Sequence, residues 1–399
     1  MKTYLMPVSL LNIAAFLMVV SLSCSANNES EPDSDAPSDP VTQQPDHSNG
    51  INSPLNSDQA TSGAVRNISV TDFVDEMGIG WNLGNSMDVE DIDKTAWGNP
   101  LPTAAMIEKI AERGFSTLRI PVTWSYHQGS GPEYAIEISY LERIQALVDK
   151  ALSLGMHVII NTHHEDPWVI PTTTQADMVK PRLSSLWTQI AEQFKMYGDY
   201  LIFETLNEPR HEGSAEEWAG GTPEGRQVVN TYHKTCLEAI RSTGGNNTRR
   251  FIMISTYAAS SLDVTMNDLE VPNNDPNTII SIHSYFPFDF TLNPNGGNTW
   301  GTQNDIEELK SELERIYLKW IVQEQKPVIL GEWGTTFKNN NSSRVVYAKT
   351  YIEESLKRGL KPILWDNGLE NELGIFNRQS LDWKWHEAFV DAIIASSTK

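Results

Sequence analysis

The feature that most restricts how this chain can fold is an alternation of short apolar runs with longer amphipathic segments, which begins at about Val65. Apolar runs of this length are typical of buried strands, whereas apolar residues spaced three and four apart indicate helices. Strands are expected over 77–83, 117–121, 157–161, 201–206, 251–255, 278–282, 327–330 and 362–365. Helices are expected over 103–113, 140–154, 180–196, 227–241, 306–321, 344–357 and 383–396.

Eight strands that are nearly all followed by a helix predict a (β/α)₈ TIM barrel over residues 65–399. Only 256–277, between the fifth and sixth strands, shows no long helical pattern. The structural alternative is an open, doubly wound parallel sheet. Such a sheet is expected to carry a glycine-rich phosphate loop, and the sequence contains neither GxGxxG nor GxxxxGK.

The first 23 residues have the features of a lipoprotein-type signal peptide. Lys2 precedes an apolar run, 10–22, which is shorter than a membrane span requires. Small residues then lead to Cys24, as in a bacterial lipoprotein cleavage box, although Ser21 stands where such boxes usually carry leucine. We expect lipidated Cys24 to anchor the secreted protein to the outer membrane or cell surface of a bacterium. Ordinary secretion without lipidation is the alternative.

Residues 24–64 are expected to form a disordered acidic tether. The segment has no Lys or Arg and is rich in Ser, Asn, Pro and Gln, so it has little apolar surface to bury. Its carboxylates are Glu29, Glu31, Asp33, Asp35, Asp39, Asp46 and Asp58. They contribute to a formal net charge of −22, which argues against nucleic acid or an anionic membrane surface as a partner. An uncharged substrate is compatible with this charge.

Polar and aromatic residues gather at the ends of the expected strands. In a (β/α)₈ barrel the carboxyl ends of all strands meet at one rim, where catalytic groups lie. The residues at these ends are Asn82, Arg119, His163, His164, Asn207, Glu208, His283, Tyr285, Glu332 and Trp365. Any one of them alone would be an ordinary cap or surface residue. Their convergence on one rim predicts a functional site.

Two of these residues, Glu208 and Glu332, follow the fourth and seventh strands and should face each other across the barrel mouth. Glycoside hydrolysis needs such a pair of carboxyl groups beside the scissile bond, about 5–5.5 Å apart when configuration is retained. One carboxylate then acts as nucleophile and must stay ionised, for which Arg119 and Tyr285 could supply a cation and a donor. The other carboxyl group acts as acid and then as base, and His283 could adjust its pKa.

Metal or Ser/Cys chemistry has less support in the sequence. A zinc or iron site could be assembled from His163, His164, Glu165, Asp166 and His283. However, no HxH or HExxH occurs, and because neighbouring strand residues point to opposite sides, the two adjacent histidines are not expected to share an ion. No metal and no organic cofactor are expected. GxSxG is also missing, and Cys236 falls in an expected outer helix.

The chain from about Ser69 to its C-terminus resembles glycoside hydrolase family 5, the retaining β-glycanases of clan A. The matching pieces are WNLGN (81–85), LRIPVTW (118–124), INTHHE (160–165), LNEP (206–209), HSY (283–285), GEWG (331–334) and LWDN (364–367). The resemblance implies that Glu208 is the acid/base and Glu332 the nucleophile. The family's other active-site positions fall on Arg119, His163, Asn207, His283, Tyr285 and Trp365.

Within the family, TAWGNP (95–100), TWSYH (123–127) and His164 resemble subfamily 4, which holds endo-β-1,4-glucanases, xyloglucanases and mixed-linkage β-glucanases. This implies endo-acting, retaining cleavage of β-1,4-glucosidic bonds in cellulose-type or mixed-linkage β-glucans. Separately, we expect a monomer. The alternatives are a xyloglucan-specific endoglucanase, a β-glycanase acting on xylan or mannan, and a non-catalytic glycan-binding surface lipoprotein. Further sugar subsites are expected at Asn82, Trp97, His127, Trp168, Trp218 and Trp300, for which loop packing is the alternative.

Overall fold

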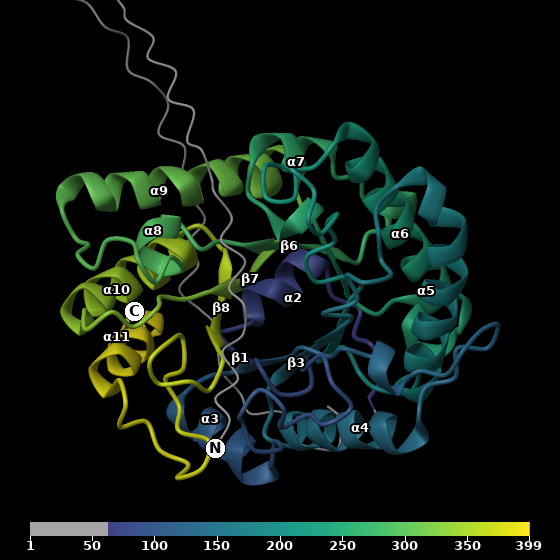
Figure 1. The fold of residues 1–399 in the computed structure, drawn as a ribbon, viewed down its shortest axis with the longest axis horizontal. Coiled ribbons are helices and arrows are strands. Elements are labelled where there is room, and N and C mark those ends of the chain that lie inside the picture. The colour runs from purple at the N-terminus through teal and green to yellow at the C-terminus, as the bar shows by residue number, and fades with distance from the viewer. Residues whose placement is uncertain (1–62, 399) are drawn as a thin grey trace, which may run out of the picture. The chain divides into compact units, whose positions relative to one another are not determined.

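Eight parallel strands close into a barrel in sequence order, with β8 pairing back to β1 (Figure 1). The computed structural model describes residues 63–398. The closed barrel confirms the predicted (β/α)₈ fold and excludes the open, doubly wound sheet. The predictions of a signal peptide, of lipidation at Cys24 and of nearly the whole acidic tether fall outside the described residues.

The strands are short, and every residue in them is buried. They are β1 (Gly80–Leu83), β2 (Thr117–Ile120), β3 (His157–Asn161), β4 (Leu201–Glu204), β5 (Ile252–Ser255), β6 (Thr278–His283), β7 (Val328–Trp333) and β8 (Lys361–Asp366). Strands of a parallel sheet are covered on both faces, which is why they appear in the sequence as apolar runs without alternation. The barrel closes where Gly80 pairs with both Thr117 and Ile363.

Helices surround the barrel in Figure 1. They are α3 (Ala104–Arg113), α4 (Ile138–Ser153), α5 (Thr173–Gln193), α6 (Pro223–Ser242), α7 (Asp263–Asp268), α8 (Phe288–Thr291), α9 (Gln303–Tyr317), α10 (Asn341–Lys357) and α11 (Glu387–Ser397). Only short helices connect β5 and β6, which agrees with the missing helical pattern there. Across 63–398, no helix combines the length and apolar character that a membrane span needs.

All seven predicted helices begin at a residue other than the expected one, and two of these shifts have a clear cause in the packing. α5 begins at Thr173, before the expected start at Lys180, and contains Pro181. Proline removes one hydrogen bond from a helix interior, but the buried face of α5 packs against the core and holds the helix together. α11 begins only at Glu387, because the preceding Trp383 packs its ring against Phe376, with 4.5 Å between centroids.

The helix α2 (Val70–Glu76) was not predicted, and neither were the short helices α7 and α8. Seven residues with two internal aspartates give a weak helical pattern, yet Val70, Phe73 and Val74 are buried at helical spacing. Phe73 stacks on Phe251, just before β5, with 4.0 Å between ring centroids. α2 therefore packs at the end of the barrel where the strands begin, opposite the rim that carries the expected site.

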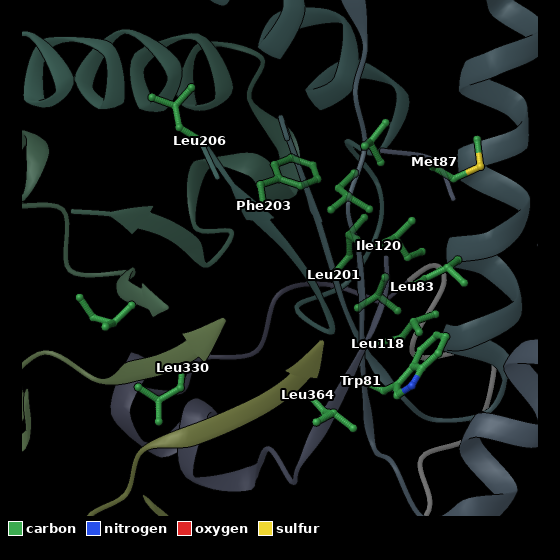
Figure 2. Close-up of a cluster of buried hydrophobic side chains, with 14 of the residues drawn as sticks. Trp81, Leu83, Met87, Leu118, Ile120, Leu201, Phe203, Leu206, Leu330 and Leu364 are labelled. Atoms are coloured by element: carbon green, nitrogen blue, oxygen red, sulfur yellow. The ribbon is translucent and has the colours of Figure 1, made fainter. Parts of the chain in front are cut away.

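The two faces of the strands serve two cores. Apolar side chains such as Trp81, Leu118, Leu201 and Leu330 belong to a large cluster that also contains the helices' buried faces (Figure 2). A second cluster joins α2 to Ile159, Ile202, Met253, Ile279, Ile329 and Ile363 of the strands. Residues two further along a strand point to the same side. The polar residues Asn161, Glu204 and Ser281 come two positions after the isoleucines of β3, β4 and β6. They therefore lie above this apolar layer, beneath the barrel mouth.

Candidate active site

The barrel brings the carboxyl groups of Glu208, just after β4, and Glu332, in β7, close together. One carboxylate oxygen of each, and one ring nitrogen of His283, all lie within 4.8 Å of one another. This short separation fits the retaining arrangement of about 5–5.5 Å between carboxyl groups, and not the inverting arrangement of about 6.5–9.5 Å. The arrangement is therefore suited to double displacement.

Both carboxylate oxygens of Glu332 are held by donors. Arg119 Nη1 donates to Oε1 from 2.9 Å, and the hydroxyl of Tyr285 donates to Oε2 from 3.0 Å. Hydrogen bonds to a carboxylate favour its ionised form and fix its orientation. Glu332 thus has the cation and the donor that a carboxylate nucleophile requires.

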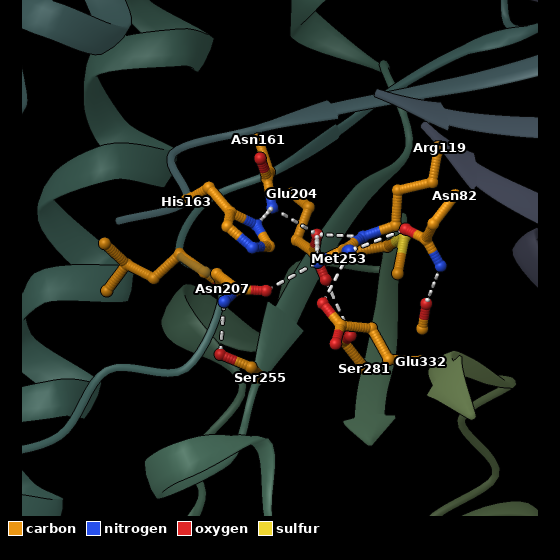
Figure 3. A network of polar contacts seen from close by, with 12 residues as sticks. Asn82, Arg119, Asn161, His163, Glu204, Asn207, Met253, Ser255, Ser281 and Glu332 are labelled. Carbon is orange, nitrogen blue, oxygen red and sulfur yellow. Dashed lines mark hydrogen bonds and ion pairs between the residues drawn. The ribbon is translucent and has the colours of Figure 1, made fainter. Parts of the chain in front are cut away.

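Arg119 itself is fully buried, and its guanidinium has a partner in every direction (Figure 3). Nη1 also donates to Asn82 Oδ1 from 2.8 Å, Nη2 donates to Asn207 Oδ1 from 2.7 Å, and Nε donates to Glu204 Oε2 from 2.7 Å. Since the Asn207 oxygen is engaged by Arg119, its amide nitrogen is left to donate to a sugar hydroxyl. Asn82 is likewise tied to Arg119 and is fully buried, so it supports the site from below and is not a sugar subsite.

His283, at the end of β6, hydrogen-bonds with Glu208: its Nδ1 lies 2.7 Å from Glu208 Oε1 and 3.7 Å from Glu332 Oε2. β7 approaches His283 closely because position 331 is glycine. A Cβ on Gly331 would lie 2.9 Å from Ser281 Oγ and 3.0 Å from His283 Nε2. The glycine of the GEWG motif therefore makes room for the imidazole beside both carboxyl groups.

Burial and charge shift the pKa values of these three groups. Burial lowers the pKa of His283, but the charge of Glu332 and the contact with Glu208 outweigh it and raise this pKa. Burial alone would raise the pKa of Glu208, yet His283 lowers it below its ordinary value. Burial raises the pKa of Glu332, against the charges of His283 and Arg119. The hydrogen-bonded pair of His283 and Glu208 thus keeps a proton to a higher pH than an isolated histidine would.

Trp365 and His163 form an aromatic wall of the site. Their rings are nearly parallel, with 5.6 Å between centroids and 7° between planes. The indole fits here because residue 84 is glycine: a Cβ on Gly84 would lie 2.6 Å from the ring. Asn161 Nδ2 lies 3.0 Å from His163 Nδ1, which orients the imidazole. The glycine of WNLGN therefore leaves space for the tryptophan of LWDN.

Three of the expected sugar subsites are covered by other side chains. His127 is 7% exposed and stacks on Tyr140 at 3.8 Å, and Trp300 is 7% exposed and packs edge-on against Tyr347 at 5.0 Å. The Trp168 indole donates to Glu165 from 2.6 Å, and the Arg182 guanidinium covers its ring at 4.0 Å. These side chains pack within loops, as the alternative expects, and their role as sugar subsites stays a prediction.

Trp97 and His164 are half-buried, and Trp218 is exposed. The rings of Trp97 and His164 meet at 5.7 Å, at the rim beside His163. Trp218 is 55% exposed, and the guanidinium of Arg210 lies 4.7 Å from the centre of its ring. Arg210 also donates to the backbone oxygen of Glu208 from 3.2 Å. Arg210 therefore connects the exposed indole of Trp218 to the backbone of Glu208.

The expectation that His163 and His164 cannot share an ion rests on strand alternation and is wrong in that step. β3 ends at Asn161, so alternation does not apply, and the two rings meet edge to face at 4.4 Å. One ring nitrogen of each histidine and one carboxylate oxygen of Asp88 lie within 4.8 Å of one another. Asp88 accepts from the backbone N–H groups of Asn85 and Ser86, at 2.8 and 2.6 Å.

The residue that the sequence analysis missed is Glu204. It lies in β4, four residues before Glu208, and its carboxylate pairs with Arg119 at 2.7 Å with both side chains fully buried. A signal was present, because a glutamate inside the apolar run 201–206 is costly to bury without a partner. The expected site contains the partner, Arg119.

Comparisons with known proteins agree with this geometry. The family model described as Cellulase (glycosyl hydrolase family 5) matches residues 78–371. The chain is 46% identical over 328 residues to Cellulase/esterase CelE of Acetivibrio thermocellus, which covers 81% of this chain but only 40% of that protein. It is 45% identical over 346 residues to Endoglucanase B of Clostridium cellulovorans, covering 84% and 78% of the two chains.

Among solved structures, that of ZgEngAGH5_4 in complex with a cellotriose superimposes with a TM-score of 0.82 at 52% identity. The superposition covers 83% of this chain and 99% of that one. The family match spans β1 to β8 and includes the rim residues described above. The chain therefore belongs to glycosyl hydrolase family 5.

Proposed function

We propose that this protein is a retaining endo-β-1,4-glucanase that cleaves internal bonds of cellulose-type or mixed-linkage β-glucans. The observation that carries the proposal is the contrast between the two carboxyl groups. Glu332 receives Arg119 and Tyr285 on its two oxygens, whereas Glu208 faces it in a hydrogen bond with His283. One carboxylate thus has a donor on each oxygen, and the other shares a hydrogen with an imidazole.

In the first step, a carboxylate oxygen of Glu332 attacks the anomeric carbon while Glu208 gives its proton to the departing glycosidic oxygen. In the second step, Glu208 takes a proton from water, whose oxygen attacks the same carbon and releases Glu332. Two inversions retain the configuration. A bound polysaccharide excludes water from Glu208, which favours its protonated form at the moment it must act as an acid.

Contacts for the sugar come from the aromatic wall and the rim. The indole of Trp365 lies parallel to His163 at the rim, where it can contact a pyranose ring, and the Asn207 amide nitrogen is placed to donate to a hydroxyl group. The relatives support a glucan substrate, since one is named an endoglucanase and a similar structure holds cellotriose. Xyloglucan, xylan and mannan share the required chemistry and are the alternatives that a substrate panel must separate.

Initial rates on carboxymethylcellulose, barley β-glucan, xyloglucan, xylan and mannan test the proposal. We expect the highest rates on the two unbranched β-glucans, with a rapid fall in viscosity that marks internal cleavage. Proton NMR of the first product should show the β-anomer. Rates confined to xylan or mannan, or no hydrolysis of any of the five, would contradict the proposed substrate or the proposed activity.

The proposal includes location and assembly. Residues 1–23 act as a signal peptide, and Cys24 becomes the lipidated N-terminus that holds the enzyme on the outer membrane, with the acidic segment as its tether. The sequence supports this through the apolar run 10–22 and the small residues before Cys24. We also propose that the catalytic domain acts as a monomer, for which sedimentation equilibrium should give a single species of its monomeric mass.

A further inference from the structure

Glu204 is a third buried carboxylate beneath the barrel mouth, and neither role in hydrolysis requires it. Its side chain is fully buried in β4, with the apolar cluster around Ile202 below and the site above. A buried carboxylate is destabilising unless charges and hydrogen bonds compensate for the lost water. Glu204 therefore has to be explained by the groups that it holds.

Three elements supply donors to this carboxylate (Figure 3). Arg119 of β2 donates to Oε2 from 2.7 Å, and Asn161 of β3 donates to the same oxygen from 3.1 Å. Ser281 of β6 donates to Oε1 from 2.7 Å. Glu204 is thus fixed from three sides and has no freedom to turn toward the sugar site.

Two of these donors, Arg119 and Asn161, also contact residues of the site. Besides Glu204, Arg119 donates to Glu332 and Asn207. Besides Glu204, Asn161 contacts His163, with 3.0 Å between Nδ2 and the ring Nδ1. The backbone oxygen of Gly331, next to Glu332, is bonded by Asn82 at 2.9 Å, and Asn82 is in turn bonded by Arg119. Side chains from six strands, β1 to β4, β6 and β7, are connected through Glu204 and Arg119.

We propose that Glu204 is a positioning residue, which holds Arg119 so that a single N–H reaches Glu332 and which orients His163 through Asn161. The charge of Glu204 also offsets that of Arg119, which weakens the attraction of Arg119 for Glu332. This inference rests on the proposed function, because it assigns a role in the hydrolysis carried out by Glu332.

The charged and titratable groups that face Glu332 are Arg119 from β2, His283 from β6, Tyr285 just after β6 and Glu208 just after β4. Replacing Glu204 by glutamine keeps the volume but leaves Arg119 with one anion instead of two. The full attraction of Arg119 then acts on Glu332 and lowers its pKa. A less basic carboxylate is also a weaker nucleophile.

The test compares Glu204→Gln with the wild type on the polysaccharide that the wild type hydrolyses best. We expect the acidic limb of kcat/KM to move to lower pH by about one unit. We also expect kcat to fall about tenfold with KM changed by less than about twofold, because an interaction of the transition state is lost. Glu204→Asp keeps the charge, so its acidic limb should stay at the wild-type pH.

Glu312→Gln is the matched control. Glu312 is another buried, ion-paired glutamate, 8% exposed, but it lies in the outer helix α9 and pairs with Arg315. We expect this variant to lose thermal stability and to keep the wild-type pH profile. If Glu204→Gln behaves in the same way, Glu204 is merely structural and the inference is overturned.

Should Glu204→Gln not fold, Glu204→Asp decides the question, since withdrawing the carboxylate by one methylene should lower kcat per folded molecule at constant KM. An unchanged kcat in that variant overturns the inference. A wild-type enzyme inactive on every polysaccharide would instead contradict the proposed function, so the two failures are distinguishable.

Discussion

The hydroxyl of Tyr285 lies 3.0 Å from Oε2 of Glu332 and donates its hydrogen bond to the oxygen that Arg119 does not reach. The two donors come from opposite sides of the barrel and leave the carboxylate one orientation. This relationship ties the proposed nucleophile to a neutral donor as well as to a cation. Each donor stabilises the ionised form of Glu332.

Replacing Tyr285 by phenylalanine removes one donor and keeps the ring. Because the hydrogen bond favours the ionised carboxylate, its loss should raise the pKa of Glu332 further above its ordinary value. The acidic limb of kcat/KM should therefore move to higher pH, and kcat should fall about 10²-fold. Tyr347→Phe is the control, since its hydroxyl donates to the backbone oxygen of Phe286. If the acidic limb of Tyr285→Phe stays at the wild-type pH, this hydrogen bond does not lower the pKa of Glu332.

Trp218 should contribute to polysaccharide binding. One side of its indole faces Arg210, which Asp166 and Glu217 hold at 3.0 and 2.9 Å, and more than half of its surface is exposed. Stacking of a sugar on such a ring contributes about 1 kcal/mol, so Trp218→Ala should raise KM for the polysaccharide about fivefold at unchanged kcat. Trp218→Phe should restore most of the affinity. If the alanine variant has the KM of the wild type, Trp218 does not contribute to polysaccharide binding.

His157 should make the fold sensitive to acid. It is buried between Phe73 and Tyr200, and neither ring nitrogen has a hydrogen-bond partner within the described residues. Burial, and then the charges of Arg66 and Lys361, lower its pKa from 6.5 to about 3. Below about pH 6.5 the unfolded chain therefore binds a proton at His157 and the folded chain does not. The free energy of unfolding falls as the pH falls below about 6.5.

Between pH 7 and pH 5 this histidine should cost about 2 kcal/mol of unfolding free energy. His157→Phe keeps an aromatic ring and removes the titrating group. Urea unfolding at the two pH values should therefore show a decrease about 2 kcal/mol smaller in the variant. Equal decreases in both proteins would mean that His157 already binds its proton in the folded state.

The proposed anchor predicts the behaviour of Cys24→Ala. Without the thiol there is no lipid attachment, so the full-length variant should move from the membrane pellet to the soluble fraction in the native host. Its rate on soluble β-glucan should equal that of the wild type, because the catalytic domain is unchanged. Membrane association that survives the substitution would contradict lipidation at Cys24.

The fold was predictable because each strand is an apolar run and each long helix has a buried face. The strand ends then placed the rim residues correctly, since Arg119, Glu208, His283, Tyr285 and Glu332 do meet. In a parallel barrel, position along the chain alone decides which side chains share the rim. That part of the site follows from topology.

Packing could not be predicted in the same way. Trp300 and Trp365 are both tryptophans in segments next to the rim, and only their neighbours distinguish them: Tyr347 packs against one, whereas His163 lies parallel to the other. The role of Asn82 likewise depends on Arg119 reaching it from another strand. α2 was missed because seven residues form a helix only when the barrel covers their apolar face.

The central claim is that Glu332 is the nucleophile and Glu208 the acid/base. An activated 2-deoxy-2-fluoro cello-oligosaccharide should trap the covalent intermediate, because the fluorine slows both steps and the good leaving group restores only the first. Glu208→Gln should still form this adduct, whereas Glu332→Ala should not. Peptide mass spectrometry of the trapped wild type should find the sugar on Glu332, and a sugar found on Glu208 would contradict the account.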